Sequence, residues 1–381
     1  MTDAPLKGLK VLELARVLAG PWIGQTLADL GADVIKVEAP QGDDTRRWGP
    51  PWIDHDGERS AAYYHACNRG KRSISADFKT EEGRELVRKL VMQSDVLVEN
   101  FKHGGLAKYG LDYATLKALN PRIVYCSVTG FGHTGPYADY AGYDFIIQGM
   151  SGLMDLTGEP DGAPQKVGIA IADLLTGLYG VIAIQAALAG REKTGEGQHI
   201  DMALMDCLTG VLSNQAMNYL VTKESPKRLG AAHPNIVPYQ AFPVRDGYLI
   251  IAVGNDGQYQ RLVELLNLEI GRDPKFSTNA GRVEHRVELV PTIAEQTRKW
   301  TRDDLLQACE DHTIPAGPIN TLADVFNDPQ TIAREMAILV DGVPGVRTPI
   351  TFTDGELAIG RPSPKLDEHR DEILAEIGLI E

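Results

Sequence analysis

The stretch KGLKVLELARVLAGPWIGQTLADLGADVIKVE, residues 7–38, decides the fold class. Residues 10–14 form a short apolar run that is typical of a buried strand, and residues 15–21 form a loop. Residues 23–31 have the spacing of an amphipathic helix, and residues 32–38 form a second apolar run. We therefore predict a β-α-β unit at the start of the chain.

The same alternation of strand and helix continues beyond this unit. We predict strands over residues 73–78, 95–101 and 122–130, with a helix from Glu81 to Met92. Because short apolar strands alternate with helices, we expect an α/β fold whose parallel sheet is covered on both faces. Such sheets bind ligands at the carboxyl ends of their strands, where the loops read ARVLAGP, ENFKHGG and TGFGHTGP.

The second half of the chain has a different pattern. A long apolar helix begins near Asp173, a second is predicted over residues 201–221, and residues 224–240 are predicted to be a linker because they contain Pro and Gly. The block after the linker is typical of a smaller α+β domain. Its predicted elements, with those that follow, are a hairpin over residues 239–253, helices over 258–266, 283–300 and 302–311, strands over 337–340 and 348–352, and a final helix over 369–377 that could return to the first domain.

Composition excludes several classes of protein. A chain of 381 residues usually forms two domains, and a hydrophobic fraction of 43% with a charged fraction of 24% is ordinary for an ordered globular protein. A net charge of −14 argues against a nucleic-acid or anionic membrane surface, although it leaves room for a local basic pocket. The four cysteines have no metal-binding or disulfide spacing and are expected to be reduced thiols; they are Cys67, Cys126, Cys207 and Cys309.

Neither a targeting segment nor a membrane span is expected. Glu13 and Arg16 interrupt the apolar run near the N-terminus, so it does not fit a signal or transit peptide. The apolar run over residues 174–188 is shorter than the ~20 residues that a bilayer requires. We expect a cytoplasmic protein.

The first loop does not fit a dinucleotide site. A pyrophosphate-binding turn needs three closely spaced glycines, whereas this loop offers only Gly20 and Gly24 around a Pro and a Trp. The patterns of a P-loop, a zinc-protease helix and a G-x-S-x-G elbow are also absent from the sequence. We expect no metal and no permanently bound cofactor.

A basic cluster lies in the segment NRGKRSISADFKT, and further lysines follow in VENFKHGGLAKYG. Most charge runs are solvated faces. These two flank predicted strand ends, where a phosphorylated ligand would lie across the sheet, and they therefore indicate a nucleotide-like ligand. The cationic residues are Arg69, Lys71, Arg72, Lys79, Lys102 and Lys108.

Asp173 stands at the start of the apolar helix IADLLTGLYGVIAIQAALAGREKTGEG, residues 171–197. An Asp at this place is typical of an N-cap, which accepts hydrogen bonds from the free N–H groups of the first helical turn. The alternative is that the carboxylate reacts, and the residues of the helix alone do not decide between the two.

Several separated segments together resemble the family III CoA-transferases, a family that also includes the α-methylacyl-CoA racemases. The resemblance covers nearly the whole chain, and within the family it is strongest to the succinyl-CoA:dicarboxylate, glutarate-type transferases, through GDDTRRWGPP and VPYQAF. The matching segments are LARVLAGPWIGQTLADLGADVIKVEAPQGDDTR, NRGKRSI, DVLVENFKHGGLAKYGL, PRIVYCSVTGFGHTGPYADYAGYD, ADLLTGLYG, HPNIVPYQAF and IPAGPIN.

The resemblance implies a fold and an assembly. It implies a large, doubly wound, Rossmann-like domain built from both chain ends, residues 1–222 and 321–381, that binds CoA. A small α+β domain with its linkers would occupy residues 223–320. Family members form interlocked homodimers, so we expect a homodimer whose substrates are acyl-CoA and small carboxylic acids, with coenzyme A thioesters as substrates rather than as bound cofactors.

The resemblance also assigns a role to Asp173, which matches the family's nucleophile. Cap and reagent would then be one residue, and we expect the N-terminal partial charge of the helix to keep the carboxylate ionised at neutral pH. Such a carboxylate would take the acyl group and then CoA from a donor, expected to be succinyl-CoA, through aspartyl anhydride and aspartyl-CoA thioester intermediates.

CoA contacts are carried over by position from the family, and two are added from charge. Lys71 and Arg72 are the two added from charge. The positions that match are Leu18, Ala19, Ala76, Asp77, Phe78, Lys79, Asn100, Phe101, Lys102 and Lys108.

The acyl and acceptor side is assigned more sparsely. Arg46 and Arg47 are candidates for a distal substrate carboxylate, with a surface role as the alternative. Tyr143 stands where racemases have His, and because a phenol with a pKa near ~10 is a poor proton shuttle at neutral pH, it favours acyl transfer over epimerisation. Asp144 would orient the acyl group or Tyr143, or end a loop. The remaining candidates are His233, on the small-domain side, and Gly254 and Gly257, in a loop that either closes over the site or is an ordinary turn with an Asn/Asp cap.

Two alternatives stay open from the sequence. The first is an α-methylacyl-CoA racemase or epimerase of the same family. The second is a non-catalytic module that binds CoA without turnover.

Overall fold

The computed structural model describes residues 3–380, and the chain divides into two compact units. The first unit contains Met1–Leu153, Lys166–Lys223 and Pro329–Glu381, and the second contains Met154–Gln165 and Glu224–Asp328. The division departs from the predicted boundaries at Lys223, which belongs to the first unit, at residues 321–328, which belong to the second, and at residues 154–165. Residues 154–165 join the second unit because Gly158 accepts a hydrogen bond from the N–H of Gly230 and Asp155 pairs with Arg228 at 3.0 Å.

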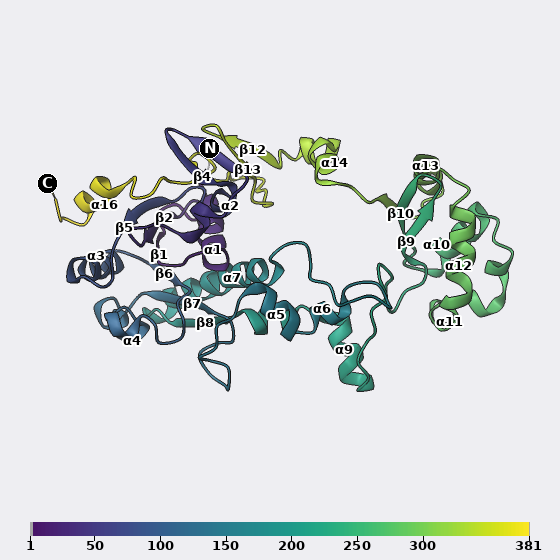
Figure 1. Ribbon diagram of the computed structural model, residues 1–381, viewed down its shortest axis with the longest axis horizontal. Coiled ribbons are helices and arrows are strands. Elements are labelled where there is room, and N and C mark those ends of the chain that lie inside the picture. The colour runs from purple at the N-terminus through teal and green to yellow at the C-terminus, as the bar shows by residue number, and fades with distance from the viewer. Residues whose placement is uncertain (1–2, 381) are drawn as a thin grey trace. The chain divides into compact units, whose positions relative to one another are not determined.

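A six-stranded sheet is the centre of the first unit (Figure 1). Its order is β5-β2-β1-β6-β7-β8, and every neighbouring pair is parallel. The chain runs outward from β1 to one edge and then from β6 to the other, which is the order of a doubly wound sheet. The predicted parallel α/β sheet is therefore confirmed. Its strands are β1 (Lys10–Glu13), β2 (Asp33–Glu38), β5 (Arg72–Ser75), β6 (Val96–Glu99), β7 (Val124–Thr129) and β8 (His199–Ala203).

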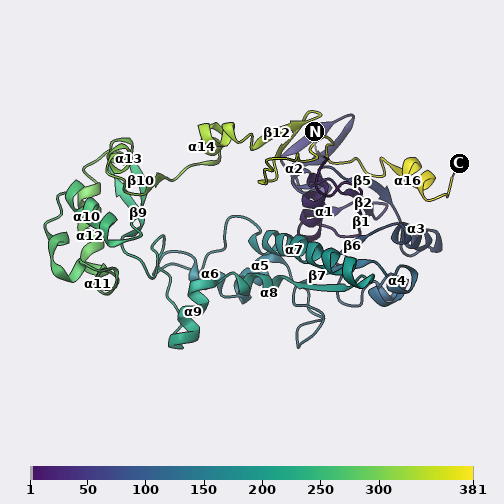
Figure 2. The same cartoon turned by 180° about the vertical axis from the view of Figure 1, so that it is seen from behind.

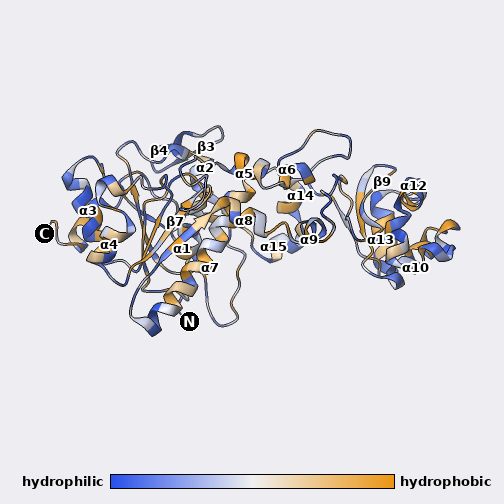
Figure 3. Ribbon diagram, turned by 90° about the horizontal axis from the view of Figure 1, so that it is seen from below, coloured by the Kyte–Doolittle hydropathy of each residue, from blue (hydrophilic) through white to orange (hydrophobic). Residues whose placement is uncertain are grey.

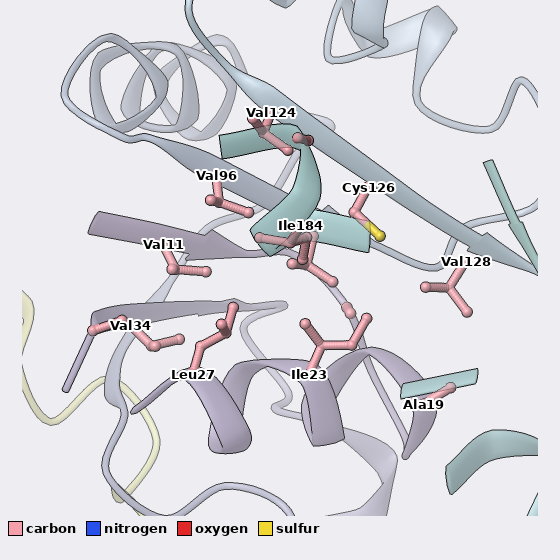
Figure 4. Packing of buried hydrophobic residues seen from close by; sticks show 14 of the residues in the cluster. Val11, Ala19, Ile23, Leu27, Val34, Val96, Val124, Cys126, Val128 and Ile184 are labelled. Carbon is pink, nitrogen blue, oxygen red and sulfur yellow. The ribbon is translucent and has the colours of Figure 1, made fainter. Parts of the chain in front are cut away.

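Alternating side chains of the strands fill a core on each face of the sheet. Val11 and Val98 pack against one group of helices, whereas Leu12 and Leu97 pack against the other. Figure 4 shows the first of these cores, where valines of the strands meet Ile23 and other apolar residues of the helices. The helices on this face are α1 (Ala19–Asp29), α5 (Asp144–Met150), α7 (Ile171–Thr194) and α8 (Leu204–Gly210), and those contributing to the opposite core are α3 (Glu81–Met92), α4 (Tyr113–Leu119) and α16 (Arg370–Glu376).

Helix α1 lies unusually close to β1, and two glycines make this possible. A Cβ atom at Gly20 would collide with the Cβ of Ala15, and one at Gly24 would collide with the carboxylate of Glu13. The helix begins at Ala19, four residues earlier than the apolar spacing predicts, because Gly20 and Pro21 are both tolerated in a first turn that faces the strand. The glycines of this loop thus serve helix–strand packing.

The second unit has a smaller antiparallel sheet, of order β11-β10-β9. Its core contains Phe242, Leu249, Tyr259, Phe276 and Leu305, all fully buried. The predicted hairpin is confirmed, and Ala316–Pro318, for which the sequence predicts no strand, pairs with β10 as a third strand. The elements are β9 (Tyr239–Val244), β10 (Gly247–Ala252), α10 (Asp256–Leu265), α11 (Asn279–Glu284), α12 (Arg286–Thr297), α13 (Arg302–Asp311), β11 (Ala316–Pro318) and α14 (Leu322–Asn327), with short 3-10 turns at Ile270–Arg272 and Pro274–Phe276.

Two of the predicted elements are wrong. The helix predicted over residues 201–221 is interrupted: its first residues belong to β8, and a turn at Val211 and Leu212 separates α8 from α9 (Ser213–Thr222), whose first residue, Ser213, has a φ of +48°. The strand predicted over residues 348–352 is instead β13 (Val343–Val346), which forms a hairpin with β12 (Ala337–Val340) around the turn at Asp341 and Gly342. In both places the apolar pattern continues past a backbone turn that it does not encode.

The remaining elements of the first unit are short. A hairpin and a one-turn helix follow the 3-10 turn Asp44–Arg47. The hairpin consists of β3 (Trp52–His55) and β4 (Glu58–Ala61), and the helix is α2 (Ala62–His65). The other short elements are a 3-10 turn at Ala107–Tyr109 and α15 (Pro329–Ala333). Helix α6 (Leu153–Leu156) contains the point in the sequence at which the first unit gives way to the second.

Among the described residues, α7 is the one helix long and apolar enough to cross a membrane by length and composition alone. Helix α7 packs along α1 (Figure 2). Its residues Ala172, Ile184 and Ala187 are buried in the core that the two helices share. A buried core helix passes the same test of length and composition as a span, so one such helix is weak evidence.

We predict that Gly20→Ala lowers the free energy of unfolding by about 1–3 kcal/mol, because the added methyl group overpacks the contact between α1 and β1. Thermal or denaturant unfolding measures the change. The matched control is Gly190→Ala in α7, where a Cβ meets nothing within 4 Å. This control should raise stability by about 0.5–1 kcal/mol through helix propensity, and equal effects at the two positions would contradict the packing argument.

Candidate active site

A cavity of about 610 Å³ opens at the carboxyl ends of the central strands. Its walls come from the loops after β1, β6 and β7, so it lies where the strand order reverses, between β1 and β6. Its volume is in the range of small-molecule sites. The lining residues are Arg16, Val17, Leu18, Ala19, Asp44, Trp48, Asn100, Phe101, Lys102, His103, Gly105, Lys108, Tyr109, Val128, Thr129, Gly130, Ala138, Tyr140, Ala141, Gly142, Tyr143, Asp173 and Leu204.

Asp173 lies in the wall of this cavity, in the first turn of α7. The N-cap of the helix is Ala170, so the prediction that Asp173 caps the helix is wrong. Asp144 takes part of that role instead, since its Oδ1 accepts a hydrogen bond from the N–H of Ala172 at 2.8 Å. Gln148 holds Asp144 in place by donating from Nε2 to its Oδ2 at 2.8 Å.

The environment of Asp173 raises its pKa to about 7. Burial is the larger cause, because it penalises the charged form, and the negative charge of Asp144 adds to it. Both effects act against the expected influence of the helix N-terminus, because they raise the pKa of this carboxylate whereas the helix would lower it. Near pH 7 the two protonation states are about equally populated.

Tyr143 reaches the cavity through a close crossing of two loops. A Cβ atom at Gly130 would collide with the backbone of Gly142, and the reverse is also true, so the loop after β7 can pass the segment before α5 only with glycine at both places. Tyr143 follows this crossing, lines the cavity and remains 66% exposed. The phenol is thus available to a ligand.

Six of the predicted CoA contacts are brought together at the cavity. Asn100 also ties two walls to each other: its side chain accepts from the N–H of Arg16 at 2.8 Å and donates to the carbonyl of Arg16 at 2.6 Å. Lys102 and Lys108 supply positive charge to the wall. The six are Leu18, Ala19, Asn100, Phe101, Lys102 and Lys108.

The segment Ala76 to Lys79 does not line the cavity. Phe78 packs against the rings of Phe101 and Tyr109, each with centroids 6.1 Å apart, so the segment lies behind the wall rather than in it. A contact of CoA with Ala76, Asp77, Phe78 or Lys79 stays a prediction.

Lys71 and Arg72 are not at the cavity, which corrects the prediction from charge. Lys71 is fully buried, and its Nζ pairs with Glu13 at 2.8 Å. Arg72 forms ion pairs with Asp33 and with Glu376 of α16, so it fastens the C-terminal helix to the sheet. Their partners neutralise both cations, and neither is free for a phosphate.

Arg46 is likewise committed to the fold, which corrects its assignment to a substrate carboxylate. Its guanidinium donates two hydrogen bonds to Glu38, at 2.7 and 2.8 Å, and one to the hydroxyl of Tyr64 at 2.6 Å. Arg47 is exposed and pairs with Asp44 at 3.3 Å. Arg47 does not line the cavity, although Asp44 does.

Of the predicted residues of the second unit, His233 and Gly254 lie in loops and Gly257 lies in the first turn of α10. His233 accepts at Nδ1 from the N–H of Asn235, at 3.1 Å. Asn255 caps α10 by accepting from the N–H of Gln258, so the segment with Gly254 and Gly257 has the geometry of the capped turn, one of the two alternatives. Contacts of His233, Gly254 and Gly257 with a substrate stay predictions.

Sequence reasoning missed Arg16, Trp48 and Tyr63. The rings of Trp48 and Tyr63 meet edge to face at 5.3 Å, and Trp48 lines the cavity. Burial, with the charge of Asp173 next, raises the pKa of Tyr63 to about 12. Arg16 lies in the ARVLAGP loop that the sequence singled out, and its charge at a strand end was the available signal. Trp48 and Tyr63 gave no such signal.

Within residues 3–380, no group of three His, Cys, Asp or Glu residues has a geometry that would hold a metal ion. The wall of the cavity contains the carboxyl group of Asp173, whose pKa is about 7, together with a phenol and several cationic side chains. These groups surround about 610 Å³ of space.

A family model described as CoA-transferase family III matches residues 6–370. The chain belongs to CoA-transferase family III. The succinate–glutarate CoA-transferase of Agrobacterium fabrum is 59% identical over all of this chain and 99% of its own length. The human succinyl-CoA:glutarate CoA-transferase is 40% identical, over 98% of this chain and 86% of its own length.

Solved structures agree with this membership. A CaiB/BaiF family protein from Brucella suis is 66% identical and superposes with a TM-score of 0.90, covering 99% of this chain and all of that one. A protein from Mycobacterium tuberculosis, 28% identical, has a TM-score of 0.88 over 98% of this chain and all of its own. The predicted family and the prediction of an enzyme are both confirmed, and CoA thioesters are the substrates of such transferases.

We predict that Asp144→Asn lowers the pKa of Asp173, because it removes a negative charge while the amide oxygen can still accept from Ala172. Carboxyl titration by carbon-13 NMR of labelled protein measures the shift. Asp139→Asn is the control, since Asp139 is exposed and pairs with His103 rather than with Asp173. An unchanged or higher pKa of Asp173 in Asp144→Asn would contradict the assigned cause.

Proposed function

We propose that this CoA-transferase moves CoA from succinyl-CoA to a dicarboxylic acid such as glutarate, with Asp173 as the nucleophile. The observation that carries the proposal is the position of Asp173: a carboxylate in the wall of the cavity at the switch point of the sheet. The names of the relatives from Agrobacterium fabrum and human, both for succinate or succinyl-CoA with glutarate, support the choice of substrates.

The reaction begins when the Asp173 carboxylate attacks the carbonyl carbon of the donor thioester. The carbon–sulfur bond breaks, CoA leaves as a thiolate, and Asp173 holds the acyl group in a mixed anhydride. The thiolate then attacks the aspartyl carbonyl carbon, the anhydride carbon–oxygen bond breaks, and the donor acid departs as a carboxylate. Asp173 now carries CoA as a thioester.

The second half repeats these steps in reverse order with the acceptor. The acceptor carboxylate attacks the aspartyl thioester, forms a second anhydride and releases the thiolate. The thiolate attacks the acceptor carbonyl of this anhydride, which yields the new acyl-CoA and regenerates the Asp173 carboxylate. A thioester replaces a thioester, so no external energy source is required.

The pKa of Asp173 has two opposing consequences for this chemistry. Only the ionised form attacks, so a pKa of about 7 leaves roughly half of the enzyme reactive at neutral pH. The same desolvation makes the ionised carboxylate a stronger nucleophile than a solvated one, because it has less hydration to lose. Reactivity should rise with pH through about 7.

The cations and the phenol divide the cavity by function. Arg16, Lys102 and Lys108 offer charge to the phosphates of CoA. Tyr143, which lines the same cavity and is exposed, offers a hydroxyl to the acyl group or acceptor. Because it is a phenol and not an imidazole, a second acid–base group for epimerisation is not provided at this position.

We also propose that the protein works as a homodimer, with the interlocked arrangement expected from the family. Leu178, Tyr179 and Ile182 of α7 are between 42% and 62% exposed, and Phe145 and Ile146 of α5 are 59% and 47% exposed. Apolar residues on α5 and α7 are visible in Figure 3. An exposed apolar surface of this kind is typical of a protein interface, and a second copy is the occupant that the proposal names.

We predict that the protein converts succinyl-CoA and glutarate into glutaryl-CoA and succinate, and that Asp173→Ala reduces the rate at least about a thousandfold. Mass spectrometry of the acyl-CoA species follows both directions. Asp206→Asn, an exposed Asp in the first turn of α8, is the matched control and should retain activity.

Other outcomes of this experiment separate the alternatives. Exchange of an α-hydrogen of a branched acyl-CoA with solvent deuterium, without transfer to any acid, would favour a racemase. Binding of CoA with no turnover and no effect of Asp173→Ala would favour a binding module. Either result would overturn the proposed function.

We predict a dimer in sedimentation velocity, weakened at least about tenfold in dissociation constant by Ile182→Glu, because a charge must then be buried among apolar groups. Met92→Glu, at an exposed position of α3, is the control. A wild-type monomer at micromolar concentration, or equal effects of the two substitutions, would contradict the proposal.

A further inference from the structure

Val17 has a backbone conformation that β-branched residues rarely adopt. Its φ is +69°, in the left-handed region that favours glycine. The residue lies in the wall of the cavity, between Arg16 and Leu18, directly before α1. A strained residue persists only when its surroundings hold it, and such residues gather at functional sites.

Asp43 and Cys67 hold both polar groups of the Val17 backbone. The N–H of Val17 donates to the carboxylate of Asp43, at 3.2 Å to Oδ2 and 3.4 Å to Oδ1. The carbonyl of Val17 accepts from the thiol of Cys67 at 3.5 Å. The preceding residue, Arg16, is fixed on both its N–H and its carbonyl by Asn100. Three side chains, those of Asp43, Cys67 and Asn100, thus hold the backbone of Arg16 and Val17.

Asp43 is itself fixed by buried groups. Its side chain is fully buried and pairs with Lys36 at 3.1 Å. Thr45 donates to Asp43 Oδ1 from its N–H at 3.0 Å and from its hydroxyl at 2.8 Å. Burial alone would raise the pKa of Asp43, but the charge of Lys36 and the hydrogen bonds of Thr45 hold it below its usual range. Asp43 therefore stays an anion and a strong acceptor for Val17.

We propose that Asp43 and Val17 are positioning residues: Asp43 holds Val17 in the left-handed conformation, and this sets the wall at Arg16–Ala19 against which acyl-CoA binds. The inference rests on the CoA transfer proposed above. It adds Asp43, which does not line the cavity and acts through Val17. If the hydrogen bond from Val17 to Asp43 is weakened, Val17 relaxes towards negative φ and the wall moves. A glycine in place of Val17 adopts the left-handed conformation without this support.

The test is a double-mutant cycle of Asp43→Asn with Val17→Gly, measured as kcat/KM for CoA transfer. With Val17 present, Asp43→Asn should lower kcat/KM by about tenfold or more, the scale of a left-handed non-glycine residue. In the Val17→Gly background, the same change should cost no more than about threefold, because glycine needs no support at this φ. A purely structural role of Asp43 predicts equal losses in both backgrounds, because glycine does not restore the partner of Lys36. Equal losses would overturn the proposal.

Two further variants provide a second test and a control. Thr45→Val removes one hydrogen bond that orients Asp43 and leaves every charge in place, so it repeats the comparison if Asp43→Asn does not fold. Thr45→Val should lower kcat/KM less than Asp43→Asn does, and this loss should also be smaller in Val17→Gly than with Val17 present. Glu58→Gln, which breaks the pair of Glu58 with Arg46 at 3.3 Å, is the control and should act alike in both backgrounds.

Titration calorimetry with CoA separates this proposal from the proposed function. If the wild type binds CoA but transfers it to no acid, the proposed function fails, and the cycle is then evaluated from the dissociation constants of CoA. If Asp43→Asn weakens CoA binding when Val17 is present but not in Val17→Gly, the positioning role is still supported. Equal losses of CoA affinity in the two backgrounds overturn it. A wild type that neither transfers nor binds CoA overturns both proposals.

Discussion

A buried cluster of charges around Glu13, the last residue of β1, determines where the cavity of the candidate active site can form. Glu13 of β1 pairs with Lys36 of β2 at 3.1 Å and with Lys71 before β5 at 2.8 Å, and Lys36 continues to Asp43; all four side chains are buried. Removing one partner would leave a charge unpaired in the interior, which costs far more than the pair contributes. The cluster therefore fixes the ends of β1 and β2 and, through Asp43, the loop that begins the cavity wall.

In the site that results, the ionised form of Asp173 is destabilised, and we propose that this makes it more reactive. Asp173 lies in a desolvated position beside Asp144, and its pKa of about 7 shows that the fold does not fully support its ionised form. A carboxylate tightly held by cations would be ionised but unreactive, because attack would break those contacts. The cations of the cavity include Lys102 and Lys108, on the loop after β6, which the proposed function assigns to the phosphates of CoA. Under that proposal, cations bind CoA and an uncompensated carboxylate carries out the chemistry.

How far the sequence predicts this arrangement depends on the range of each interaction. The parallel sheet and the place of Asp173 in the chain follow from local patterns and from the family resemblance. The role of Lys71 did not, because its partner Glu13 is 58 residues away and nothing local distinguishes a buried cation from a phosphate ligand. The raised pKa of Asp173 was missed for the same reason, since burial and the approach of Asp144 are products of the tertiary fold. Tyr63, the neighbour of Trp48, carries no pattern at all.

The central claim is that Asp173 bonds covalently to CoA, and trapping that intermediate tests it most directly. The protein would be incubated with succinyl-CoA without an acceptor acid, quenched in acid, digested and mapped by mass spectrometry. The account predicts a CoA adduct on the peptide that contains Asp173, which is lost on adding glutarate and absent in Asp173→Ala. An adduct on another side chain such as Asp144, or free glutaryl-CoA formed without any adduct, would contradict it.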